Sequence, residues 1–321
     1  MPIDLKKMLR ETLIFPIFKN IKKAIFNKVS PQYDRIFCDI TNICNLRCPH
    51  CYNNWADEYL QKSLFMTMEH FEKIIPIASL ASKGMFYLSC AFEPTLHPKF
   101  FEMLKKIPHN LQKQITFTTN LTTNISDNTF EKLSAMRIHA INISIESFVP
   151  EIYEQSRKNA KYDRFIGNLD RMVYFFKKEP KSPPIRFITL VTKLNAQEIP
   201  SIIEKCHTLY HAFENEIRYP WITPGPWNTS ANFDWLNKFT LPLSDWKLFT
   251  ASLKKVPFRF ALIPPREDFG KDQENKKSDL KILWIRPDGV LRIEQEKSVN
   301  SFHIDSIANP IRFLKKKLLI L

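Results

Sequence analysis

The sequence predicts an α/β protein whose central sheet is parallel. Short apolar, β-rich runs alternate with helical patterns between residues 34 and 223, and each helical pattern is long enough to carry the chain back along a sheet. Such alternation is typical of βαβ units. The chain has 321 residues, of which 44% are hydrophobic and 13% aromatic, so it can bury one large core and a smaller second one.

The predicted elements follow one another regularly along the chain. The first strand alternates apolar side chains through Ile36, Cys38 and Ile40, and a helix with a kink at Pro76 is expected over 67–82. Further strands are expected at 85–90, 114–120, 140–147, 185–193 and 216–223. The helices between them are expected at 99–107, 128–136 (capped by Ser126 or Asp127), 162–178 and 196–209. The strands give a count of six repeating units.

The first part of the chain, residues 1–33, reads as a basic amphipathic helix region interrupted at Pro16. Asp4 and Glu11 are the only acids among many basic residues of 1–30. Two interpretations stay open. The helix packs its apolar side against the domain, which is the usual use of such a stripe, or it lies on an anionic membrane surface. The apolar side consists of Leu5, Met8, Leu9, Ile17, Ile21, Ala24 and Ile25.

Three thiols lie within eight residues directly after the first strand: Cys44, Cys48 and Cys51. Three sulfurs in one loop can converge on a thiophilic metal or an iron–sulfur cluster. A zinc site would need a fourth ligand, and His50 is held between two of the cysteines. A Cys-Pro-His-Cys dithiol redox centre would leave Cys44 unused. A 4Fe–4S cluster on three thiolates keeps one iron open, which makes the cluster reactive.

The spacing Cys-x3-Cys-x2-Cys behind a strand, with Tyr52 directly after the third cysteine, resembles the motif of the radical S-adenosylmethionine (SAM) enzymes. The resemblance implies an incomplete (β/α)6 barrel, one 4Fe–4S cluster on Cys44, Cys48 and Cys51, and SAM as second cofactor, with Tyr52 near its adenine. It also implies a small electron donor such as flavodoxin or ferredoxin. Reductive cleavage of SAM would give a 5′-deoxyadenosyl radical that abstracts hydrogen from a substrate.

The strand ends carry further likenesses to the same family, on the rim where such barrels place their chemistry. The second strand is followed by Ala91-Phe92-Glu93-Pro94, where the family commonly has Gly-Gly-Glu-Pro. The two glycines are replaced, but Glu93 keeps its register. Later strand ends resemble the family at Asn120 and Ser144, and Arg157 matches a Tyr-x-x-x-Arg stretch. The resemblance implies that these residues hold SAM: Glu93, Asn120, Ser144 and Arg157. Glu146 is expected to face the substrate.

The pattern changes after residue 224, which divides the expected core at 34–224 from a C-terminal extension at 225–321. The extension has an aromatic irregular stretch, a helical pattern at 244–256 and a candidate strand at 258–263. A β-hairpin follows at 280–295, with its turn at Pro287-Asp288-Gly289. The hairpin resembles the SPASM or twitch extension of peptide-modifying radical SAM enzymes. No cysteine follows Cys206, so we expect a single cluster.

Charge and composition limit which partners and which cell compartment are expected. The net charge is +14, but the lysines are scattered and form no single stripe, so the charge does not favour a nucleic acid as substrate. No apolar run reaches the ~18 residues of a membrane span, and no signal peptide is recognised. Six cysteines, three of them clustered, fit a reducing cytoplasm better than a disulfide framework. A peptide or small molecule is the expected substrate.

If residues 1–30 bind a membrane surface, their deletion abolishes co-sedimentation of the protein with anionic vesicles, because the lysines and the apolar stripe are lost together. SAM cleavage is expected to persist in the shortened protein. Vesicle pelleting of the full-length and shortened proteins checks this. Equal pelleting of both proteins would favour the interpretation in which this segment packs against the domain.

Overall fold

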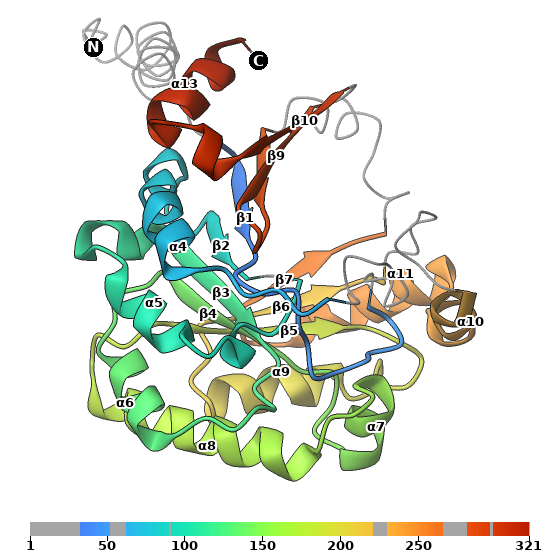
Figure 1. Cartoon of the computed structure of the whole chain (residues 1–321). Helices are drawn as coiled ribbons and strands as arrows, with labels where there is room; N and C mark the ends of the chain where they lie inside the picture. The colour runs from blue at the N-terminus through green and yellow to red at the C-terminus, as the bar shows by residue number, and fades with distance from the viewer. Residues whose placement is uncertain are drawn as a thin grey trace, which may run out of the picture.

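The computed structural model describes residues 33–51, 62–89, 91–220, 230–265, 281–295 and 298–320. Within these residues the strands form one sheet of mixed direction, with helices along its outer side (Figure 1). The strands are β1 (Arg35–Cys38), β2 (Phe86–Leu88), β3 (Ile115–Thr119), β4 (Ala140–Ser144), β5 (Ile185–Leu190), β6 (Glu214–Arg218), β7 (Phe260–Ile263), β8 (Ile282–Ile285), β9 (Val290–Gln295) and β10 (Ser298–His303).

The helices connect successive strands. The α-helices are α4 (Met68–Ile74), α5 (Phe100–Lys106), α6 (Asp127–Ser134), α7 (Pro150–Ser156), α8 (Tyr162–Lys178), α9 (Ile199–Thr208), α10 (Ser230–Phe239), α11 (Leu243–Ser252) and α13 (Pro310–Ile320). Shorter 3-10 turns are η2 (Ile75–Leu80), η3 (Pro94–Leu96), η4 (His109–Gln114), η5 (Leu253–Lys255) and η7 (Ile304–Ser306).

The sheet order is β10-β9-β8-β1-β2-β3-β4-β5-β6-β7. Strands β1 to β7 pair in parallel with their neighbours, and β8 pairs in parallel with β1. Strands β8, β9 and β10 pair antiparallel. The predicted α/β class with a parallel sheet is therefore confirmed, and an antiparallel C-terminal extension continues the same sheet.

The parallel part of the sheet has one strand more at each edge than the six predicted strands. Strand β7 lies in the region expected to form an extension, yet it hydrogen-bonds β6 at one edge. The predicted hairpin at 280–295 forms β8 and β9, and β8 inserts beside β1 at the other edge. Strand pairing therefore crosses the expected boundary at 224 on both sides, and the division into 1–33, 34–224 and 225–321 remains a prediction.

Two helix boundaries differ from the predicted ones for reasons in the local sequence. The expected helix over 67–82 ends at Ile74 and continues as the tighter η2, because Pro76 cannot donate an α-helical hydrogen bond. Its start is as expected, with Thr67 accepting from the His70 amide at 3.1 Å. Helix α9 begins at Ile199, later than predicted, where Pro200 suits the first turn.

A continuous apolar core fills the space between the sheet and its helices. Phe117 of β3 meets Phe100 of α5 edge to face, with ring centroids 5.5 Å apart. Cys38 in β1 and Cys206 in α9 are completely buried in this core, as expected for structural thiols. Burial of these side chains holds the sheet in place and leaves the loops at the strand ends to carry the functional groups.

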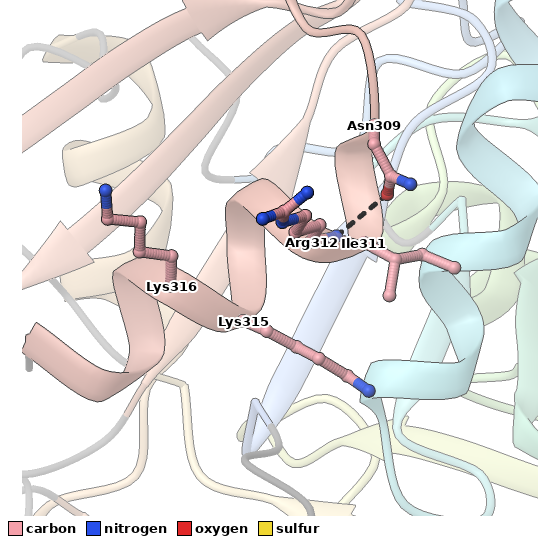
Figure 2. A pocket seen from close by; sticks show the side chains of 5 residues that line it. All are labelled: Asn309, Ile311, Arg312, Lys315 and Lys316. Carbon is pink, nitrogen blue, oxygen red and sulfur yellow. Dashed lines mark hydrogen bonds between the residues drawn. The ribbon is translucent and has the colours of Figure 1, made fainter.

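Helix α13, which follows β10 and η7 along the chain, packs against η2 (Figure 1). Leu314 and Leu318 are buried on its inner side. Asn309 begins the helix by accepting from the Arg312 amide at 2.9 Å, and the open pocket beside it is lined by basic side chains, Lys315 and Lys316 among them (Figure 2). Among the described residues, no helix is both long and apolar enough to cross a bilayer.

Substituting Gly84 by Ala is expected to destabilise the protein by about 1–3 kcal/mol. Gly84 has φ of +76°, and an added Cβ would lie 2.4 Å from Cδ2 of His139. Gly167, in α8, is the matched control, because an added Cβ there meets nothing within 4 Å. Gly167→Ala should stabilise by about 0.5–1 kcal/mol. Urea unfolding of both variants measures the difference. Equal stabilities would show that the turn at Gly84 tolerates a side chain.

Candidate active site

The three-cysteine loop leaves β1 and is fixed by backbone contacts from both sides. Asn42 donates from Nδ2 to the Lys62 carbonyl at 2.8 Å and accepts from the Leu64 amide at 2.8 Å. Thr41 donates to the Leu64 carbonyl at 2.9 Å. The Arg47 amide donates to the Lys158 carbonyl at 3.0 Å, which ties the middle of the loop to the segment after α7. The loop is therefore an ordered platform in a region without helix or strand.

The thiols of this loop form no disulfide among the described residues and are half-buried. Sγ of Cys44 accepts from the Leu46 amide at 3.4 Å and from Nδ2 of Asn120 at 3.7 Å. Burial raises the pKa of Cys44 to about 12 and raises the pKa of Cys48 well above its usual range. Without a metal these thiols stay protonated, whereas a bound metal deprotonates coordinating thiols. Three soft donors, with two N–H groups directed at the sulfur of Cys44, fit an iron–sulfur cluster.

Glu93 lies under the loop with only 1% of its surface exposed. Its Oε1 accepts from the Thr95 hydroxyl at 2.6 Å, the Thr119 hydroxyl at 2.8 Å and the Thr95 amide at 3.2 Å. Its Oε2 accepts from the Asn120 amide at 2.7 Å. Burial raises the pKa of Glu93, and these donors counteract the rise. The carboxylate joins the turn after β2 to the end of β3.

Asn120 connects the end of β3 to the cysteine loop. Its Nδ2 donates to Oδ1 of Asn45 at 3.0 Å, and its Oδ1 accepts from the Thr122 hydroxyl at 2.6 Å. Asn45 in turn donates to the same hydroxyl at 2.8 Å. The small polar ring places Asn120 beside Cys44, and its role in binding SAM stays a prediction. Thr95, Asn45 and Thr122 were not identified from the sequence, because no motif marks them.

Arg157 forms a buried two-point ion pair with Glu146. Its Nη2 donates to Oε1 of Glu146 at 2.9 Å and its Nε donates to Oε2. Glu146 was expected to face the substrate, yet only 2% of its surface is exposed. Burial lowers the pKa of Arg157, but the charge and the hydrogen bonds of Glu146 act against this, and the pKa lies above its usual value. The guanidinium therefore stays charged beside the cysteine loop.

His50 lies against this ion pair without joining it as a cation. Its Nε2 is 3.9 Å from Oε1 of Glu146, and its ring lies 5.7 Å from the ring of Trp235 in α10. Burial lowers the pKa of His50 to about 4, so the imidazole is neutral at neutral pH. Trp235 belongs to the aromatic stretch that was expected to be irregular, but it lies in helix α10.

Ser144 and Tyr52 are the two remaining residues that were predicted to hold SAM. Ser144 ends β4, half-buried, in register with Ile188 of β5. It lies on the same rim as Asn120, since the ends of neighbouring parallel strands meet at one edge. Tyr52 lies outside the described residues, as does Cys90. The structure thus brings together the cysteine loop, Glu93, Asn120 and Arg157, with Ser144 at the adjoining strand end.

Comparison with known families identifies the chain. A model of the Radical SAM superfamily matches residues 39–206. The chain belongs to the radical SAM superfamily. The matched span contains the cysteine loop and every strand from β2 to β5. The 4Fe–4S cluster and SAM are the cofactors typical of this family, so membership favours the iron–sulfur interpretation over the zinc and dithiol alternatives.

Individual relatives of this radical SAM protein are distant. A probable GTP 3′,8-cyclase of Methanocaldococcus jannaschii is 25% identical over 170 residues, which cover 53% of this chain and 54% of that protein. The chain thus spans about half the length of the curated relatives it matches. SuiB of Streptococcus suis bound to SAM superposes with a TM-score of 0.60 at 14% identity, covering 89% of this chain and 68% of SuiB.

SuiB bound to its precursor peptide SuiA gives a TM-score of 0.57 at 15% identity, covering 87% of this chain and 65% of SuiB. At such identity these likenesses concern the fold alone. They confirm the parallel sheet of the radical SAM type with an antiparallel C-terminal strand extension. The expected likeness of the cysteine-free hairpin to a SPASM or twitch domain remains a prediction.

Replacing Cys44, Cys48 or Cys51 singly with Ala is expected to abolish cluster assembly, because a 4Fe–4S cluster held by two thiolates loses a structural ligand. Cys38→Ala and Cys206→Ala are the controls, since both thiols are buried in the core away from the loop. Iron and sulfide analysis after anaerobic reconstitution measures the outcome. Full iron content in Cys48→Ala would show that this loop does not hold the cluster as predicted.

Proposed function

We propose that this protein cleaves SAM reductively and uses the product to abstract hydrogen from a peptide or small-molecule substrate. The observation that carries the proposal is a loop of three thiols, with Cys44 beside Asn120 and Cys48 beside the Arg157–Glu146 pair, in a radical SAM fold. The cluster, when bound, supplies the electron that converts SAM to methionine and a 5′-deoxyadenosyl radical.

Arg157 is the proposed partner of the SAM carboxylate. Two of its nitrogens, Nε and Nη2, are engaged by Glu146, and Nη1 has no hydrogen-bond partner within the described part of the chain. Glu146 thus fixes the plane of the guanidinium and leaves one edge for a ligand. Charge-assisted bonds from a guanidinium to a carboxylate are strong and directional. This arrangement supports a site for an amino-acid moiety beside the cluster.

Glu93 is the proposed partner of the SAM ammonium. A carboxylate oxygen accepts two hydrogen bonds readily, and Oε2 already accepts from the Asn120 amide. The other oxygen is occupied by the two threonine side chains and one amide. Asn120 and Ser144 would complete the polar wall around SAM, and Tyr52 would pack near its adenine. Replacement of the family's glycines by Ala91-Phe92 limits how closely this segment approaches the ligand.

The substrate and the electron donor belong to the same proposal. The relatives include GTP 3′,8-cyclases, which favour a small molecule as substrate, whereas the likeness to SuiB bound to a precursor peptide favours a peptide. Trp235 beside His50 offers an aromatic wall near the cysteine loop for either. We propose flavodoxin or ferredoxin as the reductant and the cytoplasm as the compartment. A membrane contact through residues 1–30 stays a prediction, and nucleic acid is not favoured.

Anaerobically reconstituted protein is expected to form 5′-deoxyadenosine from SAM when dithionite is added. Arg157→Lys should weaken SAM binding roughly tenfold to a hundredfold, the equivalent of about 1.5–3 kcal/mol for hydrogen bonds to a charged group. Lysine retains the charge, so Glu146 is not left unpaired, but it cannot form the two-point contact. Titration of SAM and chromatography of the nucleoside measure both effects.

Arg312→Lys, on the surface of α13, is the matched control and should bind SAM normally. Single-cluster stoichiometry is checked in the same samples, with about four iron per chain expected. Cluster-loaded protein that never yields 5′-deoxyadenosine would refute the proposed function. Unchanged SAM affinity in Arg157→Lys would refute only the assigned role of that residue.

A further inference from the structure

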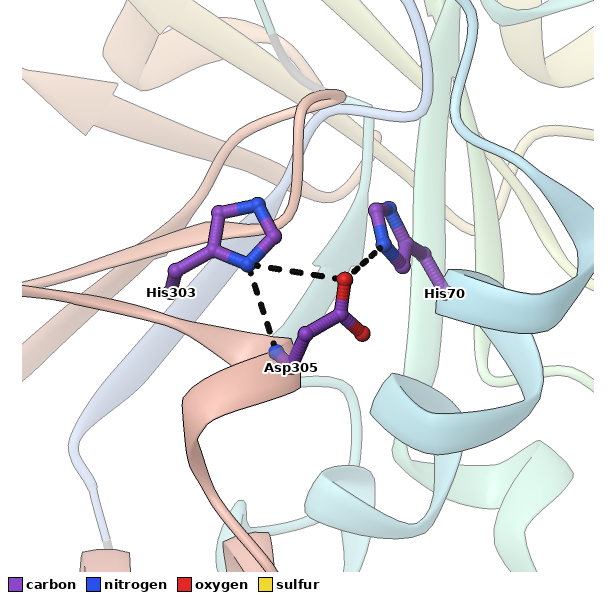
Figure 3. Close-up of side chains that lie close together, drawn as sticks. All are labelled: His70, His303 and Asp305. Carbon is purple, nitrogen blue, oxygen red and sulfur yellow. Dashed lines mark hydrogen bonds and ion pairs between the residues drawn. The ribbon is translucent and has the colours of Figure 1, made fainter.

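A second group of potential metal ligands lies away from the cysteine loop, between α4 and the C-terminal extension (Figure 3). His70 comes from the first turn of α4, His303 ends β10, and Asp305 belongs to η7. Each offers one ligand atom, and these atoms lie within 4.8 Å of one another. No step of the proposed function uses these residues. They unite segments more than two hundred residues apart in the sequence.

The spacing of the donor atoms suits a small divalent metal. Oδ2 of Asp305 is 3.0 Å from Nε2 of His70 and 3.6 Å from Nδ1 of His303. Ligands of a tetrahedral zinc ion, at about 2.0–2.2 Å from the metal, lie roughly 3.3–3.6 Å from one another. Two imidazole nitrogens and one carboxylate oxygen are a common donor set for zinc and for other first-row metals. The two separations that involve Asp305 are within a few tenths of an ångström of these values, and the two imidazole nitrogens lie within 4.8 Å of each other.

The hydrogen bonds of His303 determine which of its two ring nitrogens carries the lone pair. Its Nε2 lies 2.8 Å from the Asp288 carbonyl, which can only accept, so Nε2 carries the proton. Its Nδ1 accepts from the Asp305 amide at 3.3 Å, so the lone pair is on that atom, and a metal ion would take the place of this long hydrogen bond. A metal-binding histidine usually donates its second N–H to a carbonyl in this way, which fixes the ring. His303 therefore presents Nδ1 toward Asp305 already oriented for a metal.

His70 needs one change of tautomer. An ionised carboxylate accepts only, so Nε2 of His70 donates to Asp305 in the metal-free protein. Nδ1 of His70 is buried without a hydrogen-bond partner in the described structure. A metal on Nε2 would move the proton to Nδ1, which changes neither the number of buried unpartnered atoms nor the net charge of the ring.

The local charge is compatible with a cation on one oxygen of Asp305. Lys73 approaches the opposite oxygen, Oδ1, at 2.8 Å, and it also reaches Glu69 at 2.8 Å. Ligating carboxylates are themselves commonly hydrogen-bonded on the oxygen that does not face the metal. Lys73 is 41% exposed and can turn to Glu69 and water, which limits repulsion of a metal ion. The exposed Glu69 supplies a further negative charge nearby.

The turn that carries His303 and Asp305 is rigid. Ile304 between them is completely buried, and its amide donates to the Gly289 carbonyl at 2.9 Å. An added Cβ at Gly289 would lie 2.9 Å from Cγ2 of Ile304 and 3.1 Å from Nδ1 of His70. The absence of a side chain at this position of the hairpin turn therefore lets both the turn and His70 approach closely. Ligands on such fixed elements bind a metal with little loss of conformational freedom.

We propose that His70, His303 and Asp305 form a binding site for a divalent transition-metal ion of the zinc type, which fastens the C-terminal extension to α4. Water would complete the coordination, because His303 and Asp305 are 44% and 48% exposed. The site is independent of the proposed SAM chemistry. Its failure would leave that proposal untouched, and the reverse also holds.

The test uses the full chain with Cys44, Cys48 and Cys51 all replaced by Ala, so that thiols of the loop cannot take the metal. We expect this protein, freed of metal by a chelator, to bind one equivalent of Zn²⁺ in calorimetry and to unfold at a higher temperature as zinc increases. His303→Ala and Asp305→Asn in the same background should bind at least tenfold more weakly. His109→Ala, an exposed histidine outside the group, should bind as the parent does.

A second measurement covers the case in which the triple variant does not fold. Reconstituted protein with its loop thiols occupied is exposed to Co²⁺, and its spectrum after subtraction of the spectrum before addition is expected to show a visible Co²⁺ band without a new thiolate charge-transfer band. This band should be lost in Asp305→Asn. Uptake of no metal, or equal uptake in Asp305→Asn and its parent, would overturn the proposal. The three residues would then form only an ion-pair and capping group, with His303 as the cap of η7.

Discussion

The buried carboxylate of Glu93 is the contact on which the arrangement of the active rim depends. It gathers the hydroxyl groups of Thr95 and Thr119 and the amide of Asn120, while its own amide donates to the Ile43 carbonyl at 3.0 Å. The loop of thiols, the turn after β2 and the end of β3 are therefore fixed relative to one another by one residue. A carboxylate with so many donors tolerates burial that would otherwise cost several kcal/mol.

The pair of Arg157 and Glu146 has the same role on the other side of the rim. A buried ion pair adds little net stability, but removal of one partner is costly because it leaves the other charge unpaired. Such a pair is suited to holding a guanidinium in one orientation. Glu93 with its donors and Arg157 with Glu146 are thus held by neighbouring polar groups of the rim, and the apolar core lies beneath them. Orientation, more than stability, is what these buried charges provide.

The sequence predicted the features that depend on local pattern. The cysteine loop, the alternation of strands and helices, and the strand ends bearing Glu93, Asn120 and Ser144 all lie where the pattern placed them. The pairing of Arg157 with Glu146 was not predicted, because it joins two loops through tertiary contact. The pairing of β8 with β1 was missed for the same reason: nothing in either segment specifies its partner across more than two hundred residues. For the helix that contains Pro76 the sequence predicted a kink, whereas α4 ends at Ile74 and continues as the 3-10 turn η2. Helix propensity does not distinguish a kink from a change to a tighter turn.

The insertion of β8 beside β1 has a consequence for the order of folding on the ribosome. The strand that leads into the cysteine loop is synthesised first, yet one of its two neighbours emerges only after residue 281. Until then β1 presents an unpaired edge with open backbone donors and acceptors, a form prone to wrong association. Contacts of such wide sequence separation also slow folding, because a long loop must close before they form. Strand β1, which leads into the cysteine loop, therefore gains its second hydrogen-bonded neighbour only after β8 has been synthesised.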